Sequence, residues 1–164
     1  MTYLVILGAY FVTFAVIGVL SRKSLGIPTL ALAAGSLIAQ LWADSLTPLV
    51  AQLGLAIVHP PLTSIVVVLL TTLPALLVMI RAPKARSIWK SLVSSLVFAV
   101  GAVAVTYPAF ERAVVLDDAS KHIVEQIASH TPVALTIAIV FAVLEILFRK
   151  KKVKLPDEGG KQHK

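Results

Sequence analysis

The sequence contains no cysteine, and only 14% of its 164 residues are charged. Without cysteine the chain can form neither a disulfide framework nor a thiolate metal site, and redox usage does not indicate its compartment. A soluble domain carries about 25% charged residues, so the low charge content argues against an ordinary soluble domain. No polar stretch is long enough to fold as a separate soluble domain.

Sequence motifs of common enzymes are also missing. The chain has no H-E-x-x-H, no G-x-S-x-G and no G-x-x-x-x-G-K-[ST] motif. The four histidines have neither a cysteine nor a paired acidic residue at ligand spacing. The basic tail has no aromatic side chains on which bases could stack. We therefore expect no enzyme activity, no cofactor, no metal site and no nucleic-acid partner. The histidines are His59, His122, His130 and His163.

Long apolar runs dominate what is present. Hydrophobic residues make up 58% of the chain, and its mean hydropathy is +0.92. Several runs approach the roughly 20 residues that a helix needs to cross a bilayer. The sequence therefore predicts an all-α polytopic bundle over residues 1–148, with about five transmembrane helices. The expected spans are Tyr3–Leu20, Leu25–Ala43, Leu62–Ile80, Ile88–Tyr107 and Pro132–Phe148.

Two segments between these spans are apolar but shorter. Leu46–Val58 would reach only about 20 Å as a helix, so it is predicted to be interfacial or re-entrant. Ala109–Thr131 is more polar, and its Ile123, Val124 and Ile127 would share one face of a short helix. That face could lie on the membrane surface or on the bundle. The basic tail, residues 149–164, has no core-forming pattern and is expected to be disordered.

The distribution of lysine and arginine predicts the orientation of the chain. If five spans are correct, all but Arg112 and Lys121 of the 15 basic residues fall on one side. The positive-inside rule makes that side cytoplasmic, with the N-terminus outside and the C-terminus inside. Basic residues at this face are also expected to attract anionic lipids.

Three rows of small residues recur every four positions, which places each row on one helical face. Such rows let helix backbones approach closely in lipid. They predict either packing within the chain or an interface between copies, and the sequence leaves both open. The rows are Ala31, Gly35, Ala39 and Ala43; Ser91, Ser95 and Ala99; and Ala134, Ala138 and Ala142.

Ionisable residues at membrane depth are the usual markers of a transport path. Glu145 is the only acidic residue inside an expected span; it could pair with Arg149 along its helix or contribute to an ion path. Asp44 could be a solvated helix end or belong to the same path. Uncharged polar residues show no regular spacing on one face, which argues against a hydrophilic pore. These residues are Gln40, Gln52, Thr71, Thr72, Ser94, Ser95 and Thr106.

The order of parts over residues 3–110 resembles the bacterial colicin V production protein (CvpA) family. The corresponding first turn is Ser21-Arg22-Lys23-Ser24-Leu25-Gly26, the second span runs out through 43–49, and the fourth span contains Gly101. The turn lacks the acidic residue that often follows in this family, and the span over 132–148 would be an addition. The resemblance implies a bacterial inner-membrane protein tied to secretion or envelope upkeep, with no established chemistry.

Two functional hypotheses follow from these observations. The first is a non-enzymatic accessory protein of secretion or envelope maintenance that associates with itself or with a membrane protein partner. The alternative is a small transporter or channel subunit, for which Glu145, Thr71-Thr72-Pro74 and the short apolar segment after Asp44 are the motivating features.

Overall fold

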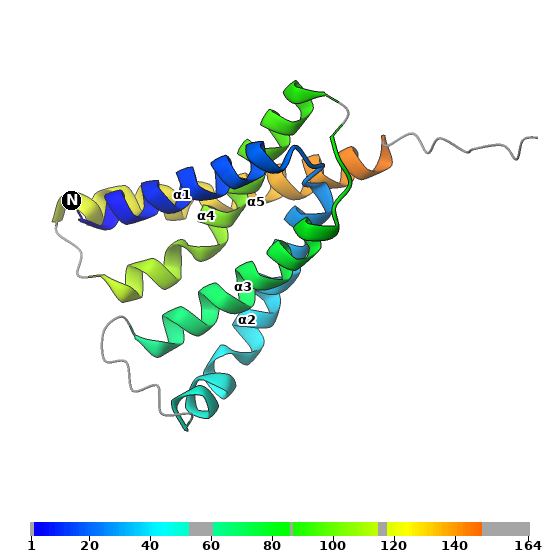
Figure 1. Ribbon diagram of the computed structural model, residues 1–164. Helices are drawn as coiled ribbons and strands as arrows, with labels where there is room; N and C mark the ends of the chain where they lie inside the picture. The colour runs from blue at the N-terminus through cyan, green and yellow to red at the C-terminus, as the bar shows by residue number, and fades with distance from the viewer. Residues whose placement is uncertain (1, 53–60, 86, 115–117, 149–164) are drawn as a thin grey trace, which may run out of the picture.

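The computed structural model describes residues 2–52, 61–85, 87–114 and 118–148 (Figure 1). Regular structure in these ranges is helical, apart from one isolated bridge between Lys23 and Lys84. Each helix is long and apolar enough to cross a membrane, so the prediction of an all-α, multi-pass bundle is confirmed. The helices are α1 (Thr2–Ser21), α2 (Gly26–Gln52), α3 (Leu62–Arg81), α4 (Ile88–Ala113) and α5 (Asp118–Leu147).

Three helix boundaries predicted from the sequence are wrong, and two of the errors lie at a proline. α2 continues through Pro48, so residues 46–52 extend this helix instead of starting a separate one; residues 53–60 lie outside the described ranges. α4 continues through Pro108 to Ala113. α5 contains Pro132, so the short helix and the fifth span are one helix of 30 residues. A proline inside a helix costs about 3 kcal/mol or more, and neighbouring contacts can offset that cost.

Contacts made by the extra turns explain why two of these helices continue. Beyond Pro108, Ala109 is buried, and the ring of Phe110 meets Tyr10 of α1 edge-on with ring centroids 5.0 Å apart. In the first half of α5, Val124 is buried in a cluster with Tyr3 of α1. The apolar face predicted around Val124 therefore lies on the bundle and not on the membrane surface.

The helices form two main pairs that α4 joins. α2 packs most extensively on α3, and α1 packs on α4, while α4 also contacts α2, α3 and α5. Figure 1 shows α2 and α3 side by side, whereas α1 and α5 lie on the opposite side of the molecule. The rings of Phe14 and Phe98 lie 5.8 Å apart where α1 meets α4. The central apolar cluster contains Phe14, Leu25, Leu32, Ala75, Met79, Phe98, Ala99 and Ala102.

The small-residue rows lie largely at contacts within the chain. A Cβ atom on Gly35 would come within 2.7 Å of the Thr71 carbonyl oxygen, so α2 and α3 are in backbone contact there. Ala138 and Ala142 of α5 are buried toward the bundle, and Ser95 packs against Gly18 of α1. The sequence also allows these rows to form an interface between copies. Because the rows are largely buried within the chain, such an interface would have to use other helix faces. Of the ten positions, Ala31 and Ala134 are half-buried and the others are buried.

The turn between α1 and α2 is bonded to the connection between α3 and α4. The Ser24 N–H donates to the Pro83 carbonyl (2.9 Å), and the Ala85 N–H donates to the Arg22 carbonyl (2.7 Å). The Lys23 ammonium donates to the carbonyl oxygens of Met79 (3.0 Å) and Ile80 (2.6 Å). A lysine at this position bonds to carbonyls of the last turn of α3, where the Met79 carbonyl also accepts the Ala82 N–H (3.2 Å), and it complements the helix dipole. The two connections therefore form one unit.

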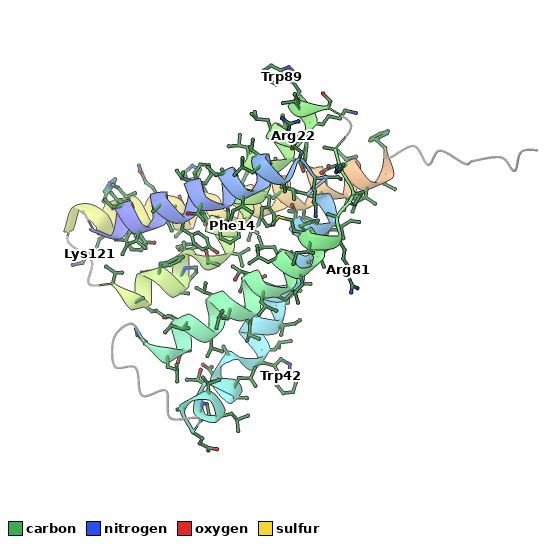
Figure 2. The ribbon with its side chains drawn as sticks, in the orientation of Figure 1. Phe14, Arg22, Trp42, Arg81, Trp89 and Lys121 are labelled. Atoms are coloured by element: carbon green, nitrogen blue, oxygen red, sulfur yellow. The ribbon has the colours of Figure 1, made fainter. Side chains whose placement is uncertain are left out.

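The two ends of the bundle differ in charge. The basic residues Arg22, Lys23, Arg81 and Lys84 lie at or next to these connections, whereas the acidic residues Asp44 and Glu111 lie in the far halves of α2 and α4, together with Arg112. Figure 2 shows Arg22 and Arg81 at the end that carries this unit, while Lys121 and Trp42 lie away from it. The C-terminal end of α5 also reaches the unit, since Glu145 accepts a hydrogen bond from Ser24. We call this the basic end; residues 149–164, including the predicted disordered tail, lie outside the described ranges.

Candidate functional site

Glu145 of α5 is held by hydroxyl groups from two other parts of the bundle. The Ser24 hydroxyl donates to Oε1 (2.7 Å), and the Ser94 hydroxyl of α4 donates to Oε2 (2.9 Å). Ser94 in turn accepts the Leu25 N–H at 3.0 Å. A Cβ atom on Gly26 would lie 3.1 Å from Oε2, so the glycine lets the carboxylate approach the start of α2. We call Ser24, Leu25, Ser94 and Glu145 the Glu145 cluster.

The Glu145 cluster has the geometry of a structural tie. A carboxylate beside a helix N-terminus is stabilised by free N–H groups and by the helix dipole, and here it also joins α5 to α2 and α4. The Arg149 partner expected from the sequence lies outside the described residues. Ser24 and Ser94 are 121 and 51 residues away along the chain, so helical spacing alone could not identify them.

A second polar region is a cleft between α2, α3 and α4 at the end opposite the basic end. Its volume is about 250 Å³. We call it the α2–α3–α4 cleft. The α2 wall consists of Ser36, Ala39, Gln40, Ala43 and Asp44; the α3 wall of Thr63, Ser64, Val67 and Thr71; and the α4 wall of Val105, Pro108, Ala109 and Arg112.

Polar residues on α2 face this cleft at regular spacing. Ser36, Gln40 and Asp44 are four residues apart, so they share one helical face beside the small-residue row. The expectation that polar groups lack regular spacing is therefore wrong for this helix. The spacing is visible in the sequence only when Ser36 and Asp44 are taken together with Gln40. Within the described residues, Ser64 Oγ and Thr71 Oγ1 are buried without a hydrogen-bond partner.

Asp44 and Arg112 place opposite charges on two walls of the cleft. Both side chains are exposed, and within the described residues no ion pair joins them. The Asp44 backbone is in the interior of α2, so the sequence interpretation of a solvated helix end holds for the side chain alone. A carboxylate and a guanidinium facing one cavity can together bind a molecule that carries both signs of charge.

No described polar route connects Asp44 with Glu145, the two residues considered for an ion path. Glu145 of α5 contacts the first turn of α2, whereas Asp44 belongs to the second half of α2. The two carboxylates therefore lie at different levels of the bundle. Between these levels, Leu32, Ala75 and Phe98 belong to the buried apolar cluster. In this conformation the two acidic groups form separate sites.

No family model matches the chain, and no curated protein or solved structure is detectably similar to it. The resemblance to the CvpA family therefore stays a prediction from the order of parts. Function has to be argued from the geometry of this chain alone.

Another hollow lies at the basic end between α1 and α4. It measures about 290 Å³ and is lined by Val19, Arg22, Ala85, Ser87, Ile88 and Ser91. This hollow has one exposed guanidinium beside the start of α4, a combination that favours negatively charged groups. Within the described residues, no three histidine or acidic side chains lie close enough to hold a metal ion.

Proposed function

We propose that this chain is a non-enzymatic, multi-pass protein of the bacterial inner membrane that acts through lateral association with a second copy or a membrane protein partner. A role as a secretion or envelope-maintenance accessory rests on the CvpA resemblance. The observation that supports association is the outer face of α5.

α5 contributes little of its surface to the bundle. Only 11% of the residues in its most apolar stretch are buried, against 44% for α4. Its exposed side chains alternate at intervals of four and three residues, the spacing of helices that cross at about 20°. Lipid tails are as apolar as these side chains, so any association must come from regular packing and not from the hydrophobic effect. The row is Val133, Ile137, Val140, Leu144 and Leu147.

Photo-cross-linking from the α5 face tests this proposal. A photoactivatable side chain at Ile137 is expected to give a discrete adduct in native membranes, either at twice the mass of the chain or at the summed mass of the chain and one partner. Val12 of α1 is a matched control, since its side chain is 56% exposed and that of Ile137 is 60% exposed. A diffuse background at Ile137, no stronger than at Val12, would contradict association through α5.

The proposed orientation places the basic end in the cytoplasm. The support is charge separation: Arg22, Lys23, Arg81 and Lys84 lie at or next to the bonded connections, where they would face anionic lipids. Because the chain has no cysteine, single cysteines report sidedness directly.

Two exposed serines at opposite ends provide the sidedness measurement. A membrane-impermeant thiol reagent is expected to label Ser45→Cys in intact cells, and Ser87→Cys only after permeabilisation. Both positions are exposed in the structure, so accessibility within the protein is not limiting. The reverse pattern would show that the basic end is outside.

A transporter or channel subunit remains the second candidate. The α2–α3–α4 cleft favours it, because polar groups on two helices continue from the mouth to Thr71, near the middle of α3. The apolar cluster between the cleft and the Glu145 cluster favours the accessory role, since it closes the polar route in this conformation.

A further inference from the structure

We propose that the α2–α3–α4 cleft binds a small zwitterion, a neutral amino acid or a molecule of similar chemistry. Arg112 would bind its carboxylate and Asp44 its ammonium group. This inference concerns binding alone, and it holds whether or not the chain associates laterally or transports the ligand.

The charges at the mouth select for a molecule with both signs. Asp44 comes from α2 and Arg112 from α4, so separate helices present the two groups to one cavity. A simple anion would be attracted by Arg112 and repelled by Asp44. A simple cation would be attracted by Asp44 and repelled by Arg112. A zwitterion satisfies both. The guanidinium can also bind a carboxylate through two parallel hydrogen bonds.

Hydroxyl groups in the α3 wall need a hydrogen-bond partner that the described chain does not provide. Ser64 is 4% exposed and Thr71 is 0% exposed, and neither hydroxyl is bonded in the described structure. Elsewhere in the described bundle, the buried hydroxyls of Ser95 and Thr106 bond to the carbonyl four residues earlier, whereas those of Tyr3, Tyr10 and Ser91 are also buried without a partner. The cleft differs in that two such hydroxyls line one cavity. Buried polar groups are normally bonded, so an unbonded pair in one cleft wall points to a polar occupant.

The dimensions of the cleft limit the size of the ligand. Thr63 and Thr71 are eight residues apart on α3, which corresponds to a depth of about 12 Å. The volume of about 250 Å³ is below the range of pockets for drug-sized molecules. Val67, Val105 and Pro108 supply apolar wall between the polar groups. These features fit a short aliphatic or hydroxylated amino acid.

Protection of a single cysteine at the cleft tests the proposal. Thr63→Cys would be labelled with a thiol reagent in the purified full chain in mild detergent, with glycine, L-valine or L-threonine added. At ten times its dissociation constant, a ligand in the cleft is expected to slow labelling about tenfold. The matched probes 3-methylbutanoate and isobutylammonium each keep one charge of valine, and neither is expected to protect at the same concentration.

Charge variants then assign the two roles. In the Thr63→Cys background, Asp44→Asn and Arg112→Gln are each expected to abolish protection, while Glu111→Gln, an exposed position outside the cleft, should leave it unchanged. Ser45→Cys, next to the cleft but not lining it, should label at the same rate with and without amino acid. Three results would overturn the proposal: no protection by any of the three amino acids, equal protection by 3-methylbutanoate, or protection that survives both charge variants.

Discussion

Gly35→Ala is expected to lower the free energy of unfolding by about 1–3 kcal/mol, the range found when atoms are added to a tightly packed contact. The added methyl group would lie 2.7 Å from the Thr71 carbonyl oxygen and 2.8 Å from that of Leu70. Both atoms belong to the backbone of α3, so no side-chain rotation can relieve the contact. α2 and α3 would have to separate along the most extensive helix pair in the bundle.

Gly8→Ala in α1 is the matched control for this experiment. Nothing lies within 4 Å of a Cβ atom at Gly8, so the substitution adds only helix propensity. We expect it to stabilise the protein by up to about 1 kcal/mol. Unfolding in mixed detergent, followed by helical circular dichroism, measures both variants. If Gly35→Ala were as stable as Gly8→Ala, the close approach of α2 and α3 would be wrong.

Glu145→Ala is expected to cost about 2–4 kcal/mol, because it removes the acceptor of two hydrogen bonds to a charged group. The Ser24 hydroxyl would lose its bond of 2.7 Å, and the Ser94 hydroxyl its bond of 2.9 Å. Glu145→Gln should cost less, since the amide keeps one acceptor oxygen and a serine hydroxyl can also accept. The same unfolding measurement applies.

Glu125→Ala is the control for Glu145, since this acidic residue lies on the same helix and is exposed. A double-mutant cycle with Ser24→Ala separates the hydrogen bond from the loss of side-chain volume. Non-additive effects for Ser24 and Glu145 are expected, and additive ones for Ser24 and Glu125. Equal losses for Glu145→Ala and Glu125→Ala would show that the Glu145 cluster does not stabilise α5.

The sequence predicts the number and type of elements well because each apolar run must be helical to satisfy its backbone in lipid. It predicts their ends poorly. The sequence pattern predicts helix boundaries at Pro108 and Pro132, but contacts of Phe110 with Tyr10 and of Val124 with Tyr3 hold the helices on the far side of each proline. Such contacts come from distant parts of the chain, and local pattern cannot reveal them.

The candidate sites were predictable only in part. Helical spacing is sufficient to place Ser36, Gln40 and Asp44 on one face, so one of the three walls of the cleft can be found in the sequence. The contribution of Arg112 cannot be found in the sequence, because it depends on α4 continuing past Pro108. For Glu145, the sequence singles out the residue, whereas its described partners follow from the packing of α5 on α2 and α4.

The contacts of Glu145 also bear on how the protein is made. Ser24 and Ser94 belong to the turn after α1 and to α4, so the ribosome has finished both donors before α5 exists. Glu145 is among the last residues of α5 to be synthesised, and it meets donors that earlier segments already supply. The bond that joins α5 to the bundle can therefore form only when translation of α5 is nearly complete. A chain interrupted before this point keeps the Ser24 and Ser94 hydroxyls without their Glu145 acceptor, so unfinished and finished copies differ chemically at the basic end.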